Sequence, residues 1–208
     1  MALWDFSQIK SYVRSLTQKK GSSLSDSDLE TAINRYYYYK FPLEVQPTEL
    51  MDWYEFNTTA SDDDYTFDDD TGIILQAPAY IDNQDARLWL DPEAFYDRFP
   101  QNSTYTEARP SDILFYGGEL ILRNPPDAVY AVKIKCLVRP TTLTSDTQTP
   151  TREEWGSIIA YGTAIELLTA DRNFEAANLL KAQYEQHKST VQQRAVQQLY
   201  SGRVKGSF

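Results

Sequence analysis

The sequence predicts an α+β protein. Two helices from each end of the chain form a four-helix bundle, and an antiparallel β-rich region is inserted between the two pairs, followed by a flexible C-terminal tail. Apolar residues recur at three- and four-residue spacing in 1–43 and again in 151–200, which is the helical period. Between them, 44–140 holds short runs of β-branched and aromatic residues separated by Pro, Gly, Asn and Asp, the pattern of strands. Neither helical pair has an apolar face wide enough for a domain, so the pairs are expected to pack together.

The first two helices are predicted in 1–43. One apolar face is formed by Phe6, Ile9, Val13 and Leu16, and the Gly21-Ser22-Ser23 run ends that helix. Ser27 and Glu30 have the spacing of a capping box that begins the second helix. Pro42 is expected to end it, since proline disfavours helical geometry in the residue before it.

Four consecutive tyrosines, Tyr36, Tyr37, Tyr38 and Tyr39, lie near the end of the second predicted helix. Successive helical residues are about 100° apart, so the four rings span roughly 300° and one core face cannot bury them all. Two interpretations follow. The rings pack by their edges and leave their hydroxyls in water, or the segment forms a subunit interface, where tyrosine is enriched.

The β-rich region contains one clear hairpin and one clear strand. Residues 112–116 and 119–123 are apolar runs joined by Gly117-Gly118, and two glycines permit the positive φ angles of a tight turn. Residues 128–139 alternate strictly, with Val132, Ile134 and Cys136 on one side and lysines on the other. This alternation predicts a half-buried antiparallel strand.

The C-terminal part is predicted to contain two more helices and a tail. Residues 141–150 form a polar linker, and Thr151 with Glu154 has capping-box spacing at the start of the third helix. A long final helix is expected at about 174–200. Residues 201–208 have no apolar period and contain two glycines, so they are expected to form a flexible tail.

Charge is distributed unevenly along the 208 residues. Thirty Asp and Glu against 20 Lys and Arg give a net charge of -10; 44–120 carries -15, whereas 1–43 carries +2 and 171–208 carries +3. Specific nucleic-acid binders concentrate basic residues on one face, and no such stripe occurs here. No apolar run has the roughly 18 residues of a membrane helix, and no signal peptide is recognised, so we expect no membrane partner.

Composition argues against an enzyme, a metal site or a cofactor. The chain has one cysteine, Cys136, and one histidine, His187, which excludes a disulfide framework and most zinc sites and histidine-dependent hydrolases. Cys136 is expected to be a buried, inert thiol, and His187 a solvated surface residue. A hydrolase that uses two carboxylates remains an alternative. The acidic residues are too numerous for the sequence to single out one catalytic pair.

An acidic run is the most conspicuous local feature. It comprises Asp62, Asp63, Asp64, Asp68, Asp69 and Asp70. A calcium loop beginning at Asp62 would need Gly at position 67 and Glu at position 73, where the chain has Phe67 and Ile73. We therefore expect a solvated acidic loop beside a short strand, with calcium coordination as the lesser alternative.

Three stretches together resemble the head-to-tail adaptor (connector) proteins of tailed bacteriophages, especially short-tailed ones. They are the hairpin and strand from SDILFYGGELILRNPPDAVYAVKIKCLVRP (111–140), the helical residues WGSIIAYGTAIE (155–166) with FEAA (174–177), and the long last helix that continues into the tail. The order of elements covers nearly the whole chain, whereas the likeness in residues is confined to about 100–180.

The resemblance implies a structural virion protein of the phage neck, made in the host cytoplasm. Such proteins form a ring of twelve copies below the portal protein, extend the DNA channel, and dock a tail or nozzle protein. The C-terminal extension of the family reaches the portal, which would place Arg203, Val204, Lys205 and Phe208 there. An acidic channel would let DNA pass without specific binding, because like charges repel.

One alternative from a different class remains. Trp53, Tyr54 or Trp89 in the β-rich region could stack on sugar rings, which would make the protein a carbohydrate- or receptor-binding module of a tail or cell surface.

Overall fold

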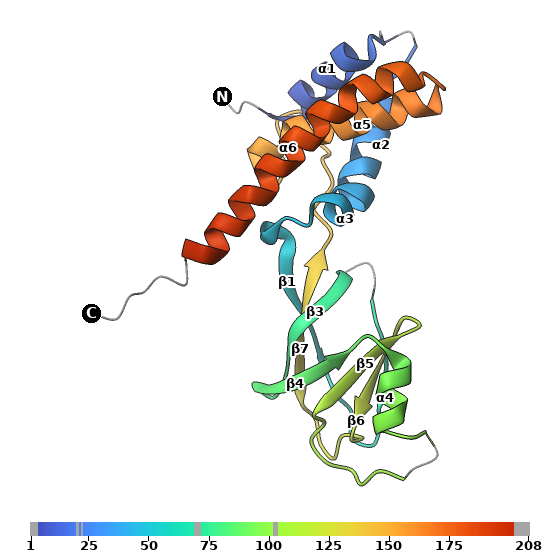
Figure 1. Cartoon of the computed structure of the whole chain (residues 1–208), viewed down its shortest axis with the longest axis vertical. Helices are drawn as coiled ribbons and strands as arrows, with labels where there is room; N and C mark the ends of the chain where they lie inside the picture. The colour runs from blue at the N-terminus through green and yellow to red at the C-terminus, as the bar shows by residue number, and fades with distance from the viewer. Residues whose placement is uncertain (1–3, 20, 22, 69–71, 102–103, 202–208) are drawn as a thin grey trace, which may run out of the picture. The chain divides into compact units, whose positions relative to one another are not determined.

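The computed structural model describes residues 4–19, 21, 23–68, 72–101 and 104–201, without the side chains of 194–201. The chain divides into two compact units (Figure 1). The helical unit comprises Met1–Leu50 and Pro140–Phe208, and the β-unit comprises Met51–Arg139.

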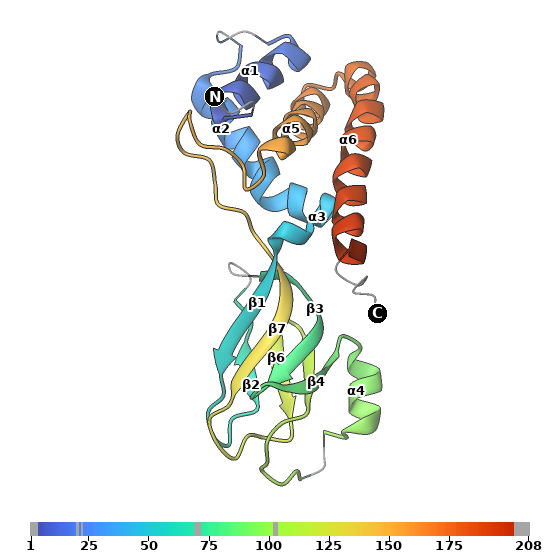
Figure 2. The same ribbon diagram turned by 90° about the vertical axis from the view of Figure 1, so that its left-hand side faces the viewer.

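The helical unit contains five α-helices and shorter helical turns. They are α1 (Phe6–Thr17), α2 (Asp26–Arg35), the π-helix η1 (Tyr36–Lys40), α3 (Phe41–Val45), the 3-10 turns η2 (Thr48–Leu50) and η3 (Glu153–Trp155), α5 (Gly156–Ala170) and α6 (Phe174–Ser201). α5 and α6 form an antiparallel hairpin in which α6 extends beyond α5 (Figure 2).

The predicted four-helix bundle is wrong, because α5 occupies the centre of the helical unit. In a bundle each helix presents one apolar face to a shared core. α5 is instead buried around most of its circumference and packs against α1, α2, η1 and α6. Its buried residues are Gly156, Ile158, Ile159, Ala160, Tyr161, Gly162, Thr163, Ala164 and Leu168.

The second helical segment also continues past Pro42, contrary to prediction. η1 shifts the backbone pairing, so that the Phe41 N–H bonds to the Tyr36 carbonyl five residues back. Pro42 then stands in the first turn of α3, where a missing N–H costs nothing. Neither predicted capping box forms: Ser25 caps α2 through the Asp28 N–H, and α5 follows η3 without a side-chain cap.

The β-unit is built on one curled, mixed sheet of seven strands. The strands are β1 (Met51–Asn57), β2 (Asp64–Thr66), β3 (Gly72–Ile81), β4 (Gln84–Trp89), β5 (Asp112–Tyr116), β6 (Glu119–Arg123) and β7 (Ala131–Val138). Their order is β1-β7-β3-β4-β5-β6-β2. The prediction of a purely antiparallel region is wrong, because β4 and β5 are parallel. Helix α4 (Pro92–Arg98) lies in the connection between them.

The predicted hairpin and strand are confirmed. Gly117 and Gly118 have φ angles of 65° and 83° and join β5 to β6. β7 pairs antiparallel with both β1 and β3, and its Val132, Ile134 and Cys136 are buried.

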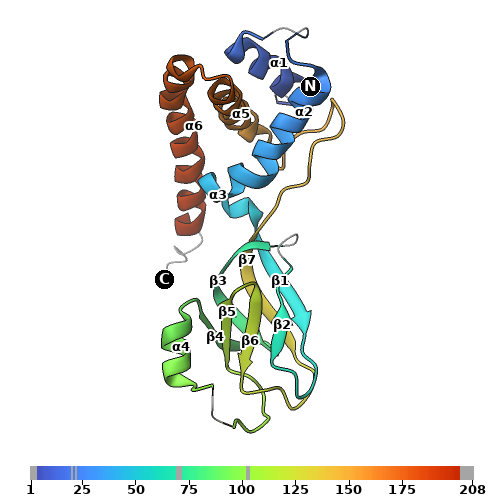
Figure 3. The same ribbon diagram turned by 90° about the vertical axis from the view of Figure 1, so that its right-hand side faces the viewer.

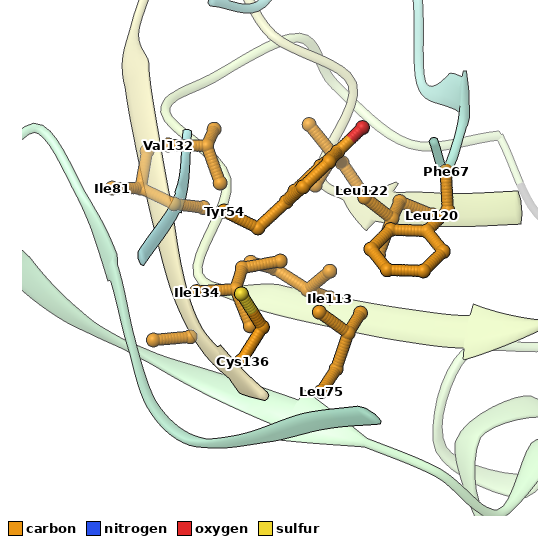
Figure 4. Packing of buried hydrophobic residues seen from close by; sticks show 11 residues of the cluster. Tyr54, Phe67, Leu75, Ile81, Ile113, Leu120, Leu122, Val132, Ile134 and Cys136 are labelled. Atoms are coloured by element: carbon orange, nitrogen blue, oxygen red, sulfur yellow. The ribbon is translucent and has the colours of Figure 1, made fainter. Parts of the chain in front are cut away.

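The core of the β-unit lies inside the curl of the sheet. Figure 4 shows side chains of β1, β3, β5, β6 and β7 converging there, with the Cys136 sulfur among hydrocarbon groups. Burial raises the pKa of the Cys136 thiol to about 11, with a smaller contribution from the charge of Asp52. The predicted buried thiol is therefore confirmed.

Tyrosine side chains join the two end strands of the curled sheet, β1 and β2. The Tyr54 hydroxyl donates to the Thr66 carbonyl (3.4 Å) and accepts from the Asp68 N–H (3.2 Å). The Tyr65 hydroxyl accepts from the Thr59 N–H (2.9 Å) and donates to the Asp62 carbonyl (2.6 Å). The bond to Thr66 occupies a backbone carbonyl of the end strand β2, and the others fix the segments on either side of β2.

We predict that Gly162→Ala destabilises the helical unit. A Cβ at position 162 would lie 2.0 Å from Cζ of the Tyr36 ring, and overpacking of a core costs about 1–3 kcal/mol. Urea unfolding followed at the helical circular-dichroism band measures the change. Gly21→Ala is the control, because its Cβ would meet nothing within 4 Å. Equal unfolding free energies for both variants would contradict the close contact.

We predict that the Cys136 thiol of the folded protein reacts poorly at pH 8. A thiol with a pKa near 11 is about 0.1% thiolate at that pH, and the thiolate is the nucleophile. A colorimetric disulfide reagent should therefore modify the native chain far more slowly than the chain in 6 M guanidinium chloride. Complete modification of the native chain at the denatured rate would show that the thiol is accessible.

Candidate functional site

The tyrosine segment divides between the interior and the surface. Tyr36 and Tyr37 are fully buried in the helical unit, Tyr38 is half-buried, and Tyr39 is 54% exposed. The π-helical turn places the Tyr36 ring against Gly162 of α5 and the Tyr37 hydroxyl beside Thr151. Of the four residues expected at a subunit interface, only Tyr38 and Tyr39 therefore present ring surface outside the core.

Tyr36 belongs to a hydrogen-bonded cluster with a carboxylate. Its hydroxyl lies 3.1 Å from Glu44 Oε2 and donates to the hydroxyl of Tyr184 on α6 (3.0 Å), which in turn donates to the same carboxylate oxygen. Gly162 leaves the room for the Tyr36 ring against α5. Burial, followed by the charges and hydrogen bonds of Tyr184 and Glu44, raises the pKa of Tyr36. The cluster thus ties α3 and α6 across α5.

A groove of about 740 Å³ lies beside this cluster. Its charged lining residues are Arg35, Lys40, Lys181, Glu44, Glu166 and Glu185. The Glu166 side chain is 13% exposed; it is ion-paired with Lys40, and its Oε2 lies 3.6 Å from Arg35 Nη2. The groove carries balanced charges and does not single out a chemical class of ligand.

In the described part of the acidic run, Asp62 and Asp63 lead into β2, Asp64 is its first residue and Asp68 follows it, as expected for an acidic segment beside a short strand. Asp63 is ion-paired with Arg123. Desolvation and then the charges of Asp63 and Glu119 raise the pKa of Asp64. Asp69 and Asp70 lie outside the described residues. Within the described ranges, no three His, Cys, Asp or Glu side chains are grouped to hold a metal ion.

The excess of acidic over basic residues lies entirely in one of the two units. The β-unit, 51–139, contains 17 acidic and 7 basic residues, a net charge of -10. The helical unit contains 13 of each and is neutral. The β-unit therefore accounts for the whole net charge of the chain. The charges of the segments 1–43, 44–120 and 171–208 predicted this separation only in part.

His187 is less solvated than expected. It is half-buried, and its ring stacks on Tyr161 at a centroid distance of 5.2 Å. Its Nδ1 lies 3.5 Å from Ser157 Oγ. Tyr161 in turn contacts Tyr12 of α1 edge to face, so the histidine belongs to an aromatic row that packs α6 onto α5 and α1.

The three aromatic residues considered for carbohydrate binding are dispersed. Tyr54 is in the core. Trp89 is half-buried, and its indole N–H donates to Asp112 Oδ1 (2.8 Å). Trp53 is 38% exposed, and its ring centroid lies 5.5 Å from that of Tyr80. The structure does not bring them together.

The residues expected to contact the portal, Arg203, Val204, Lys205 and Phe208, lie outside the described residues. In the part of the chain that the structure describes, no helix has both the length and the apolarity to cross a membrane.

A second pocket was not predicted. It has a volume of about 630 Å³ and lies in the β-unit, lined by residues of β3, β4, α4 and β5 that include Arg87, Arg98, Asp85 and Asp112. Its lining residues come from four separate elements between Ala77 and Asp112, and no sequence motif indicates the pocket.

Comparison of the sequence with protein-family models and with curated proteins found no match.

We predict that the helical unit loses stability above pH 10 through Tyr36. Below pH 10 the hydroxyl is protonated in both the folded and the unfolded chain. Above it the unfolded chain releases the proton while the folded chain retains it, because the folded pKa is raised above 10.0. The unfolding free energy should therefore fall by up to about 1.4 kcal/mol per pH unit from this group.

Urea unfolding of the wild type, Tyr36→Phe and Tyr39→Phe between pH 8 and 11 measures this effect. Tyr36→Phe should reduce the slope of stability against pH, whereas Tyr39→Phe, at an exposed position, should leave it unchanged. Identical slopes for all three chains would show that Tyr36 does not hold its proton.

Proposed function

We propose that the protein is a structural, non-enzymatic head-to-tail adaptor of a tailed-phage virion. In this proposal it forms a ring below the portal protein, extends the DNA channel and docks the tail or nozzle protein. The observation that carries the proposal is the separation of charge between a neutral helical unit and a β-unit of net charge -10.

This separation suits a protein with two tasks. DNA binding releases counterions when basic groups neutralise phosphates, so an acidic β-unit beside a channel would repel the DNA backbone and let it move. Twelve copies, the number that the family resemblance implies, would carry -120 formal charges. The neutral helical unit would not repel acidic protein partners, and its long α6 leads to the segment that resembles the portal-binding extension.

Paired affinity purification from the native host lysate tests the proposal. The baits are the full chain and a chain that stops after Tyr200, and electron microscopy of the eluates looks for rings. The full chain should recover a ring-forming protein and the truncated chain should not. A full-length chain with Arg203→Glu and Lys205→Glu separates the charge of the tail from its length.

One result would contradict the proposal, and another would change only the position of the anchor. If neither bait recovers a ring-forming protein and the chain binds oligosaccharides on an array, the protein is a carbohydrate-binding module. If all three baits recover the ring equally, the adaptor function stands, but the tail is not its anchor.

A further inference from the structure

Arg87 and Arg98 form an unusual pair within the acidic β-unit. Both line the same pocket of about 630 Å³. The Arg87 guanidinium lies 4.9 Å from the centre of the Trp89 ring, and that of Arg98 lies 5.6 Å from the centre of the Phe99 ring. Stacking uses the flat face of a guanidinium and leaves the N–H donors at its edge for an acceptor such as a carboxylate.

Three other cations of the β-unit have partners in the chain. Arg123 pairs with Asp63, Lys133 pairs with Glu55, and Arg109 donates to the Ile81 carbonyl. Among the residues that the structure describes, no ion pair joins Arg87 or Arg98 to a carboxylate. The two guanidinium groups therefore share a concave surface without an acidic partner of their own.

Two aspartates also line this pocket, and neither neutralises the pair by contact. Asp112 is 8% exposed, and its two oxygens accept from Trp89 Nε1 (2.8 Å) and Ser111 Oγ (2.6 Å). Asp85 is exposed on β4. With two positive and two negative side chains the pocket is neutral, so the net charge of -10 belongs to the rest of the unit. An incoming carboxylate meets less repulsion here than elsewhere on the unit.

The acidic residues at the start of β2 are a suitable source of that carboxylate. Asp62 and Asp64 are exposed, and the two residues flank Asp63, which is already paired with Arg123. Desolvation and then the charges of Asp63, Glu119 and Asp62 raise the pKa of Asp64, and the charge of Arg123 only partly opposes them. A cation from outside the chain would relieve this crowding of like charges.

The two surfaces lie on opposite sides of the β-unit. β4 is the middle strand in the order of seven, whereas β1 and β2 are the end strands that the curl brings together. In Figures 2 and 3, α4 and β4 are on one side of the β-unit, and β1 and β2 are on the other. Complementary surfaces on opposite sides of one unit permit a head-to-tail contact that repeats from copy to copy and can close a ring.

We propose that the Arg87–Arg98 pocket binds Asp62 and Asp64 of a second copy of this chain. This inference deepens the proposed function, because it names the contact between neighbouring β-units of the ring. The contact consists of charged hydrogen bonds near the surface, so it is weak in a single pair, is screened by salt, and gains strength when many copies close together.

Sedimentation velocity of the full chain tests the contact with two charge-reversed variants. The pocket variant carries Arg87→Glu and Arg98→Glu, and the loop variant carries Asp62→Lys and Asp64→Lys. The wild type should self-associate at 50 mM NaCl and dissociate at 500 mM. Each variant alone should associate at least about tenfold more weakly.

An equimolar mixture of the two variants is the decisive sample. The loop variant retains an intact pocket and the pocket variant retains an intact loop, so these two surfaces should pair. The lysines of the loop variant also complement the glutamates of the pocket variant, so association of the mixture should return toward that of the wild type. Lys135→Glu with Arg172→Glu changes the net charge as much as the pocket variant does, and should associate like the wild type. Circular dichroism of each variant confirms that it is folded.

The inference is overturned if the wild type stays monomeric at 50 mM NaCl, or if both variants associate like the wild type. These failures are distinguishable from failure of the adaptor function. A monomeric wild type that still recovers a ring-forming partner from lysate leaves the adaptor function intact. Restored association in the mixture without any ring-forming partner supports the contact and contradicts the adaptor.

Discussion

The rest of the helical unit depends on the enclosure of α5. This helix is apolar around nearly its whole circumference, so it cannot lie on a surface without exposing one apolar side to water. α6 covers one side, and α1, α2 and η1 from the other end of the sequence cover the rest. Enclosure of α5 therefore brings the N-terminal and C-terminal segments into one unit, with the β-unit as an insertion between them.

Close contacts make this enclosure specific. Tyr36 fits against Gly162, the fully buried Trp155 contacts Phe41 at a ring-centroid distance of 5.0 Å, and Tyr37 exchanges hydrogen bonds with Thr151. The β-unit is stabilised differently, by a hydrocarbon core and by tyrosine hydroxyls between its end strands. Because the hydrocarbon core of the β-unit contains no acidic side chain, most of the acidic residues of this unit can lie on its surface without weakening that core.

Local signals in the sequence were sufficient for some elements and misleading for others. The glycine pair at 117–118 and the alternation along β7 are local properties, and both predictions are confirmed. The prediction of a bundle was wrong because it gave each helix a single apolar face. Residues 158–164 of α5 are instead apolar or small on all sides of the helix. Asp91 and Pro92 are residue types typical of a helix start, and α4 begins there although no helix was predicted in this region. The parallel pairing of β4 with β5 and the Arg87–Arg98 pocket depend on non-local contacts, which a single sequence does not reveal.

Cryo-electron microscopy of the assembly recovered with the full chain tests the adaptor proposal most directly. The account predicts a closed ring in which copies of this chain follow the symmetry of a ring-forming partner, with the β-unit of each copy in contact with that of the next. Isolated copies bound singly to a partner, or a chain absent from any ring, would contradict it.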